Sequence, residues 1–455
     1  MLFGAKLTAA RAVGVASRAS GRGGGTTLPG RMLLRLAPDA LGRLGDRLDP
    51  TTIVSATNGK TTTAGMIAAA LEAAGRHPVH NRAGSNMTWG VATALLEQRG
   101  EEGLFEVDEA WLPKVAAQLD PTLLVLGNLF RDQLDRYGEM EALATGWGET
   151  VASRAGRTHF ALNADDPAIA DLGRDAAGEP RAGVTYFGIE DAAQALPELQ
   201  HAFDAKHCRR CGHPYAYERA FVGHLGHYSC PNCGASRPRP QIAATAIELR
   251  GMSGSDVTLR TPQGEMRLQL PLPGLYNVYN ALAAVTAALE LGVPAATIST
   301  ALATLRAAFG RVETLSIDST LLSILLIKNP AGANEVLRTL LLEAGNEKLD
   351  LWIGLNDKIA DGRDVSWVWD ADFELLAGGV RRVTCAGTRA AEIALRLKYA
   401  GWPEGSIEVV PAIEGSLDRA LAAAPGRLFA LPTYTSLLEL RKLLAARGLA
   451  EEFWR

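Results

Sequence analysis

The segment VSATNGKTTT places a glycine, a lysine and hydroxyl side chains next to one another. A glycine lets backbone N–H groups close around phosphate oxygens, a lysine supplies positive charge, and a following hydroxyl can ligate Mg²⁺. The apolar run Thr51–Val54 is expected to end a β-strand that leads into a helix beginning near Thr61. We therefore predict a nucleotide-phosphate site built on Gly59, Lys60 and Thr61. The strict motif has another glycine where this chain has Val54, so a strand–turn–helix junction that binds no phosphate remains the alternative.

Four of the five cysteines form two CxxC pairs, which is a metal-ligand spacing. Cys208 and Cys211 make the first pair, and Cys230 and Cys233 make the second after eighteen intervening residues. The spacing predicts a zinc ribbon whose closed four-thiolate site is structural and not catalytic. Paired disulfides in an exported protein are the alternative. The fifth cysteine, Cys385, has apolar neighbours and is expected to be a buried core residue.

Acidic and amide residues follow three strand-like runs, where a parallel sheet would place its functional edge. One of these runs ends in the carboxylates of Glu106, Asp108 and Glu109, which are suited to holding Mg²⁺ against nucleotide phosphates. Similar clusters lie at 127–135 and 163–167. Each cluster taken singly fits a helix cap or turn equally well, but three in succession after one phosphate loop favour a site.

The composition is that of a soluble α/β enzyme, with 47% hydrophobic and 21% charged residues in a chain of 455. The net charge of −4 gives no electrostatic reason to propose nucleic acid as a partner. No apolar stretch reaches the roughly 18 to 20 residues of a membrane-spanning helix, so we expect a soluble chain without an anchor. The first 23 residues lack a continuous apolar core, which favours an amphipathic leading helix ending at Gly23–Gly25 over a targeting segment.

Strand-like and helix-like segments alternate along the chain, as in parallel sheets covered by helices. In the first unit we expect strands at 122–126, 159–162, 243–249, 256–261 and 265–270 and a helix at 277–291. In the second unit we expect strands at 321–327, 349–353, 382–385 and 427–430. The predicted parts are a leading segment packed on the central domain (1–45), the central domain (46–312), a zinc-ribbon insertion within it (205–238) and a C-terminal domain (313–455).

The order of these motifs resembles the Mur ligase family over nearly the whole chain. The residues that carry the resemblance are Thr57-Asn58-Gly59-Lys60-Thr61, Glu106, Asn128 with Asp132 and Asp135, Asn163-Ala164-Asp165-Asp166, Asn277-Val278-Tyr279-Asn280-Ala281, Gly310-Arg311-Val312-Glu313 and Lys328-Asn329-Pro330. The resemblance implies a central ATPase domain with a phosphate-loop parallel sheet, followed by a Rossmann-like α/β domain that closes over it. It also implies that ATP activates a carboxylate to an acyl phosphate, which an amine then attacks.

The zinc ribbon and the segment LNDKIADGRDVSW at 355–367 resemble a branch of the family that amidates lipid II. In that branch, the ligase-like subunit of lipid II isoglutaminyl synthase phosphorylates the α-carboxylate of D-glutamate in the stem peptide. Ammonia from a GatD-type glutamine amidotransferase then gives D-isoglutamine. The resemblance thus implies a heterodimer in peptidoglycan synthesis that uses ATP and Mg²⁺ and binds lipid II. It would be cytoplasmic and act at the inner face of the plasma membrane, with peripheral contact through its substrate.

The resemblance also assigns roles to particular residues. Lys60 would stabilise charge on the transferring phosphoryl group, while Thr61 and Glu106 would hold Mg²⁺. Asp364 would complete a Cys-His-Asp triad whose cysteine and histidine belong to the partner subunit. Asp361 and Asp357 remain open for that role, and a cap of a turn or helix is the alternative for Asp364. The nucleotide-binding residues would be Thr57, Asn58, Gly59, Lys60, Thr61, Thr62, Asn277, Asn280 and Arg311.

Three features depart from the wider family. Ala56 stands where glycine is usual, Gln133 stands where many members carry a metal-binding histidine, and we find no equivalent of their carbamylated lysine. These departures argue against an amino-acid-adding ligase. A stand-alone Mur or folylpolyglutamate synthase-like ligase and a non-catalytic scaffold remain the alternatives, and neither of them needs a glutaminase partner and ammonia.

Overall fold

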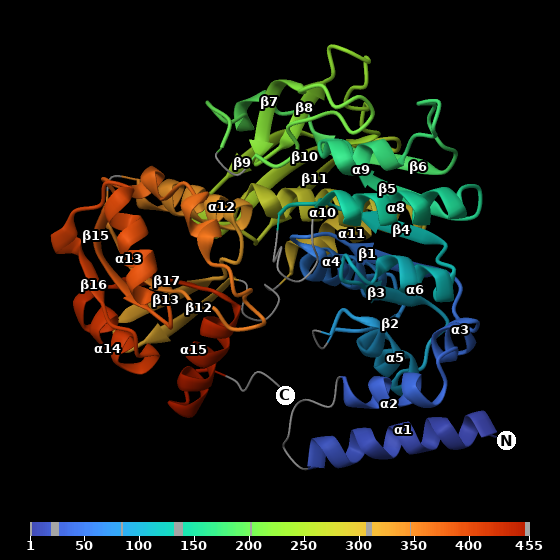
Figure 1. The fold of residues 1–455 in the computed structure, drawn as a ribbon, viewed down its shortest axis with the longest axis horizontal. Coiled ribbons are helices and arrows are strands. Elements are labelled where there is room, and N and C mark those ends of the chain that lie inside the picture. Colours follow the sequence, from blue (N-terminus) through green and yellow to red (C-terminus); the bar gives the residue numbers. More distant parts are fainter. Residues whose placement is uncertain are drawn as a thin grey trace.

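The computed structural model describes residues 2–19, 27–82, 85–131, 140–200, 203–305, 312–345 and 347–450. Within these residues the strands form a nine-stranded sheet, a six-stranded sheet and a two-stranded hairpin. Figure 1 shows the nine-stranded sheet with its helices in blue to yellow, and the six-stranded sheet beside it in orange and red. Helices flank both large sheets, so the predicted α/β class is confirmed.

The nine-stranded sheet has the order β11-β10-β9-β6-β5-β4-β1-β3-β2. Neighbouring strands from β2 to β9 are parallel, whereas β9, β10 and β11 form an antiparallel edge. The strands are β1 (Thr51–Ser55), β2 (Val79–His80), β3 (Gly103–Glu106), β4 (Leu123–Leu126), β5 (His159–Asn163), β6 (Val184–Ile189), β9 (Ile242–Leu249), β10 (Ser255–Thr261) and β11 (Gly264–Leu270).

Two layers of helices cover this sheet and enclose a separate apolar core on each face. The first core is made with α4 (Lys60–Ala73), α10 (Leu275–Glu290) and α11 (Ala295–Ala303). The second is made with α5 (Thr88–Glu97), α6 (Leu112–Leu119), α8 (Met140–Arg154), α9 (Pro167–Leu172) and the short N-terminal helices α2 (Leu28–Leu36) and α3 (Ala40–Gly45). Because both faces are covered, strands such as β1 are buried along their whole length.

The leading helix α1 (Leu2–Ala19) packs against the outer side of this second layer, next to α2 (Figure 1). Ala10 is fully buried there, and the guanidinium of Arg11 donates to the carbonyl of Leu96 at 3.0 Å. The predicted glycine end of the helix, Gly23–Gly25, lies outside the described residues. None of the described helices combines the length and the apolar character needed to cross a membrane.

The six-stranded sheet has the order β12-β13-β17-β14-β15-β16, in which only the β12–β13 pair is antiparallel. It is built from β12 (Val312–Ile317), β13 (Thr320–Leu325), β14 (Leu349–Gly354), β15 (Val380–Ala386), β16 (Ile407–Val409) and β17 (Arg427–Pro432). Its flanking helices are α12 (Pro330–Ala344), α13 (Ala390–Tyr399), α14 (Ile413–Ala423) and α15 (Tyr434–Ala446). Residues 306–311, which connect the two sheets, lie outside the described ranges, so the domain limits stay predictions.

The topology places the phosphate motif at the functional edge of the first sheet. Strand β1 lies between β3 and β4, so β2 and β3 lie on one side of it and β4, β5 and β6 lie on the other. The strand order therefore reverses at β1. Loops at the carboxyl ends of parallel strands meet at such a switch point and form ligand sites there. The loop at 56–59 follows β1, and the acidic run after β3 and the amide cluster after β4 lie on either side of it.

Candidate functional site

The loop at 56–59 turns directly into helix α4, whose first residue is Lys60, in agreement with the predicted start near Thr61. Gly59 makes this turn with a φ of +89°, a left-handed conformation that residues with a side chain rarely adopt. The position is also crowded, because a Cβ on Gly59 would lie 1.9 Å from Oδ1 of Asn280. Gly59 is therefore required both by backbone conformation and by the close approach of helix α10.

Asn128, which follows β4, holds the loop from the other side. Its Oδ1 accepts from the backbone N–H of Asn58 at 2.9 Å, and its Nδ2 donates to the carbonyl of Asn58 at 3.0 Å. Its own carbonyl accepts from the N–H of Thr57 at 2.9 Å. The hydroxyl of Thr57 in turn accepts from the N–H of Phe130 at 3.1 Å. These bonds fix the loop backbone without using the amides of Gly59 and Lys60.

Lys60 is buried and forms an ion pair with a carboxylate that sequence analysis did not choose. Its Nζ lies 2.9 Å from Oε2 of Glu109 and donates to the carbonyl of Ala56 at 3.0 Å. Burial opposes its charge, but the carboxylates of Glu109, Asp108 and Glu106 outweigh burial and raise the pKa of Lys60. Burial likewise opposes the charge of Glu109, and Lys60 together with Lys328 lowers its pKa. Both groups therefore stay charged at neutral pH.

Glu106 ends β3 and is also buried, at 5% exposure. Nδ2 of Asn86 lies 3.4 Å from its Oε1, and Asn81 exchanges two hydrogen bonds with its backbone. Thr61 lies half-buried in the first turn of α4. Carboxylate and hydroxyl oxygens are the ligands that Mg²⁺ prefers. The donor set near the phosphate loop therefore fits this ion, with Glu106 and Thr61 as the residues that would hold it.

Asn277 and Asn280 project from the first two turns of α10. Nδ2 of Asn280 donates to Oδ1 of Asn277 at 3.0 Å, and Asn277 donates to the carbonyl of Pro273 at 2.8 Å. A small cavity lies beside them, lined by residues of the loop and by Asn128, Asn163 and Asn280. Nδ2 of Asn163 is buried and has no hydrogen-bond partner in the described part of the chain. The cavity thus offers several amide groups to a polar ligand.

The C-terminal domain reaches the same loop through the segment that precedes α12. Nζ of Lys328 donates to the carbonyl of Thr57 at 3.0 Å. The side-chain amides of Asn329 and Asn58 exchange two hydrogen bonds, at 3.0 and 3.2 Å. The two domains therefore meet at the phosphate loop, although their contacting residues are 271 positions apart.

The structure brings most of the predicted site residues together, namely Thr57, Asn58, Gly59, Lys60, Thr61, Thr62, Glu106, Asn277 and Asn280. Arg311 and Gln133 lie outside the described residues, so their predicted roles stay predictions. Sequence analysis missed the pairing of Glu109, although it named the acidic run to which Glu109 belongs. Lys328 and Asn329 were noticed as a motif but received no role.

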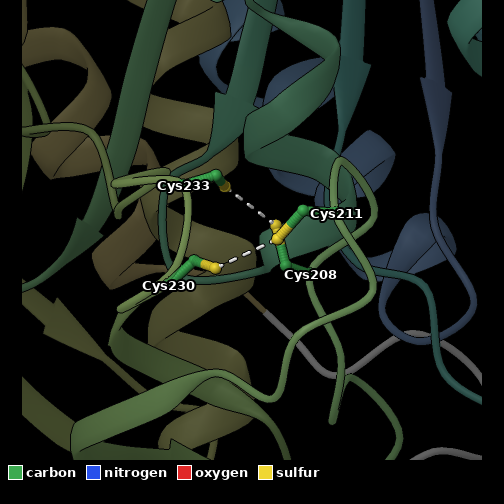
Figure 2. Close-up of side chains that lie close together, drawn as sticks. All are labelled: Cys208, Cys211, Cys230 and Cys233. Carbon is green, nitrogen blue, oxygen red and sulfur yellow. Dashed lines mark hydrogen bonds between the residues drawn. The ribbon is translucent and has the colours of Figure 1, made fainter.

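The four cysteines of the two CxxC pairs converge on one point, as Figure 2 shows. Their Sγ atoms all lie within 4.8 Å of one another, with Cys208 to Cys233 at 3.6 Å and Cys211 to Cys230 at 3.4 Å. A zinc ion with Zn–S bonds of about 2.3 Å holds four tetrahedral thiolates about 3.8 Å apart. The cluster therefore fits a closed zinc site, and these four residues would be its ligands.

The zinc ribbon is anchored to the central domain by charged and apolar contacts. Nε of Arg210 lies 2.6 Å from Oδ1 of Asp171 on α9, which fixes the first cysteine pair. Between the pairs, β7 (Ala216–Val222) and β8 (Leu225–Ser229) form an antiparallel hairpin. The end of this hairpin enters the first core, where Phe221 and Leu225 are buried. The hairpin thus has the cysteine cluster at one end, and its other end packs into the core of the domain.

The three aspartates considered for a partner's triad have different surroundings. Asp357 accepts from the hydroxyl of Thr388 at 2.8 Å and from Arg389 at 2.9 Å. Asp361 is buried and accepts from the N–H of Thr435 at 2.7 Å. Asp364 is exposed, and its Oδ1 accepts from the backbone N–H two residues later at 2.8 Å. That local bond lowers the pKa of Asp364, and the location of the residue leaves it accessible to another protein.

Cys385 is fully buried in β15, as expected, and burial raises the pKa of its thiol to about 12. A buried protonated thiol is a weak metal ligand and a weak nucleophile. Cys385 is therefore a suitable control position for substitutions of the four ribbon cysteines.

Two protein families match the chain. Residues 54–288 match the Mur ligase middle domain, and residues 326–437 match the MurT ligase C-terminal domain. The first match covers the phosphate loop, the zinc ribbon and α10. The second covers α12 and the three aspartates.

The chain is similar to several characterised proteins. It is 33% identical over 429 residues to the lipid II isoglutaminyl synthase (glutamine-hydrolyzing) subunit MurT of Staphylococcus aureus (strain N315), and the match covers 93% of each chain. A pseudomurein peptide ligase type C from Methanothermus fervidus has a TM-score of 0.67 at 23% identity and covers 88% of this chain and 79% of its own. The MurF ligase of Thermotoga maritima in complex with ADP has a TM-score of 0.63 at 14% identity and covers 92% of this chain and 85% of its own. At these identities the two structures show a shared fold.

Gly59→Ala tests the phosphate loop. The new Cβ would impose left-handed strain of about 1–2 kcal/mol and push Asn280 away, so we expect a lower Tm and at least a tenfold loss of affinity for Mg·ATP. Isothermal titration calorimetry with thermal unfolding measures both. Gly65→Ala in the same helix is the matched control, because a Cβ there meets no described atom within 4 Å and Ala favours helix. Equal nucleotide affinity in the two variants would contradict the assignment of the loop.

Cys230→Ser tests the metal site. We expect one zinc ion per purified wild-type chain and a clear loss of zinc in the variant, with Tm lower by roughly 5–10 °C because metal binding stabilises the fold. Elemental analysis by mass spectrometry gives the zinc content. Cys385→Ala is the control, since this cysteine lies in another domain and should leave the zinc content unchanged. A wild-type chain without zinc, or a Cys230–Cys211 disulfide, would contradict the assignment.

Proposed function

The chain belongs to the Mur ligase family, and from this premise we propose that it is the ATP-dependent ligase subunit of a lipid II isoglutaminyl synthase. The observation that carries the proposal is the extent of the likeness to the MurT subunit, which covers 93% of both chains and is reinforced by the match of the C-terminal domain. The likeness to the MurF structure, by contrast, is at 14% identity and shows a shared fold alone.

The geometry of the phosphate loop supports the first half of the proposed reaction. ATP would supply the phosphoryl group that activates the α-carboxylate of D-glutamate in the lipid II stem peptide. The unused loop amides and the charged Lys60 lie where they would stabilise negative charge on that group. Thr61 and Glu106 would hold Mg²⁺, and Asn277 and Asn280 would contact the nucleotide. Ammonia then attacks the activated carbonyl, phosphate leaves, and D-isoglutamine results.

The second half of the proposed reaction needs a source of ammonia, which we assign to a GatD-type glutamine amidotransferase subunit. The Staphylococcus aureus relative is a subunit of a glutamine-hydrolysing enzyme, which supports a partner for this chain. Asp364 would orient the histidine of the partner's catalytic triad, because its side chain is exposed and bonds only locally to a backbone N–H, whereas Asp357 is held by Arg389 and Asp361 is buried.

Two exposed aromatic side chains that contact each other support a partner surface on the C-terminal domain, and one of them, Trp369, closely follows Asp364 in the sequence. Trp369 ends the short helix η3 (Ser366–Trp369) and is 47% exposed, and Tyr399 at the end of α13 is 71% exposed. Their rings pack edge to face with centroids 5.8 Å apart. Aromatic residues are enriched in the cores of protein interfaces.

The lipid-linked substrate would bring the assembled complex to the inner face of the plasma membrane, in the cytoplasm.

Mass spectrometry of lipid II tests the proposed function. Lipid II is incubated with this chain, Mg·ATP and glutamine, with and without the amidotransferase subunit, and separately with ammonium. We expect conversion of the D-glutamate acid to its amide, requiring the partner when glutamine is the donor but not when ammonium is. Turnover of ATP that depends instead on an added amino acid would contradict the proposal and favour a stand-alone ligase.

Asp364→Asn separates the two halves of the reaction. A neutral amide cannot stabilise a charged histidine, so we expect glutamine-dependent amidation by the complex to fall at least ~100-fold. Ammonium-dependent amidation should keep its rate, because the phosphate loop is unchanged. Asp357→Asn is the matched control and should reduce glutamine-dependent activity less than about threefold. An equal loss with both nitrogen donors would assign Asp364 to the ligase site or to folding.

A further inference from the structure

Helix α12 of the C-terminal domain presents two glutamates to the central domain. Glu335 and Glu343 are eight residues apart, which places them on the same face of the helix. Oε2 of Glu343 accepts from the backbone N–H of Met252 at 2.7 Å. Glu335 is buried at 2% exposure, and burial raises the pKa of its carboxyl, while the nearby backbone N–H groups of Tyr276 and Leu275 act in the opposite direction. Both glutamates thus face backbone N–H groups of the central domain.

The contact made by Glu335 has a special location, because Leu275 and Tyr276 are the first residues of helix α10. The first N–H groups of a helix have no acceptor within the helix, and the residue before α10 is Gly274, which has no side chain to cap it. A carboxylate is the favoured partner there, since the helix dipole attracts negative charge. Helix α12 reaches this point, because a Cβ on Gly274 would lie 3.0 Å from Oγ1 of Thr339, one turn after Glu335. Glu335 therefore caps the positive end of α10 electrostatically from the C-terminal domain.

Helix α10 carries the amide residues of the nucleotide site immediately after this cap. Asn277 and Asn280 lie in its first two turns, and Asn280 contacts the phosphate loop at Gly59. A second bond strengthens the cap, because Arg338 forms an ion pair of 2.9 Å with Glu335. The other contact of Arg338 is a 2.8 Å bond to the carbonyl of Phe221 in the zinc-ribbon hairpin. The pair therefore joins α12, α10 and the hairpin.

We propose that Glu335 is a positioning residue that couples the position of the C-terminal domain to nucleotide binding through the N-terminus of helix α10. Movement of the domain away from α10 removes the cap and frees the first turn that orients Asn277 and Asn280. By linkage, a nucleotide that needs this turn in place favours the docked position of the domain. The inference rests on the proposed nucleotide site. It adds that Glu335, which is 55 positions after Asn280 in the chain, influences nucleotide binding at that site.

Calorimetric titration of the full-length chain with Mg²⁺ and a non-hydrolysable ATP analogue tests the coupling. Glu335→Gln removes the charge, and Glu335→Asp withdraws the carboxylate, so we expect each to weaken nucleotide binding about 5–20-fold. Glu343→Gln is the matched control, because it weakens a contact of the same kind on the same helix. Its partners are Met252 in η2 (Gly251–Ser253) and Arg427 at the start of β17, and neither element holds a proposed site residue, so we expect a change below about twofold.

Steady-state kinetics with ammonium as nitrogen donor adds a measurement that a general loss of folding would not reproduce. We expect KM for ATP to rise in both Glu335 variants while kcat at saturating ATP changes less than about twofold. Thermal unfolding checks that the Glu335 and Glu343 variants are folded to a similar extent. Equal weakening by the Glu343 variant, or wild-type affinity in both Glu335 variants, would overturn the inference and leave the nucleotide site intact. A wild-type chain that binds no nucleotide would overturn the proposed site and the inference together.

Discussion

The packing of helix α10 on helix α4 is the constraint on which the nucleotide site depends. The two helices approach so closely that Asn280 occupies the space next to the bare backbone of Gly59. Alanine makes this possible, since Ala64 and Ala68 of α4 and Ala284 and Ala288 of α10 are buried in the shared core, and small side chains allow short distances between helix axes. The alanine-rich composition of these segments is therefore a geometric requirement of the site.

The buried ion pair between Lys60 and Glu109 is a second constraint on the loop. Lys60 would be costly to bury alone, and Glu109 compensates it with an ion pair in which both groups stay charged. Such a pair adds little net stability compared with apolar residues, but it holds the ammonium beside the loop carbonyl of Ala56 in a fixed orientation. The loop amides and the lysine are thus positioned before any ligand arrives, which is the condition for strong electrostatic stabilisation of a transferring group.

Local motifs were predictable from the sequence, whereas contacts between distant segments were not. The loop between a strand and a helix and the cluster of four cysteines follow from residue type and spacing. The structure has β1 and α4 on either side of that loop and brings the four cysteines together, as expected. The sequence could not show that Glu109, and not Glu106, pairs with Lys60. Three carboxylates in one short run are equally plausible partners until the fold determines where each of them points. The proposed capping of α10 by Glu335 has no local sequence signal, since it would join two domains through a residue within an ordinary helix.

The zinc ribbon is connected to helix α10 through buried polar contacts. An insertion of this size buries too little apolar surface to be rigid alone, so a bound metal ion would supply the missing stability. Beyond the second cysteine pair, Arg237 binds the fully buried carboxylate of Asp165 at 2.6 Å, and the same carboxylate accepts from the hydroxyl of Tyr279 on α10 at 2.7 Å. A ribbon without metal would loosen Arg237 and leave Asp165 a buried charge without its cation, next to the helix that carries Asn280. The effect of a bound metal ion would therefore extend from the fold of the ribbon to the geometry of the proposed nucleotide site.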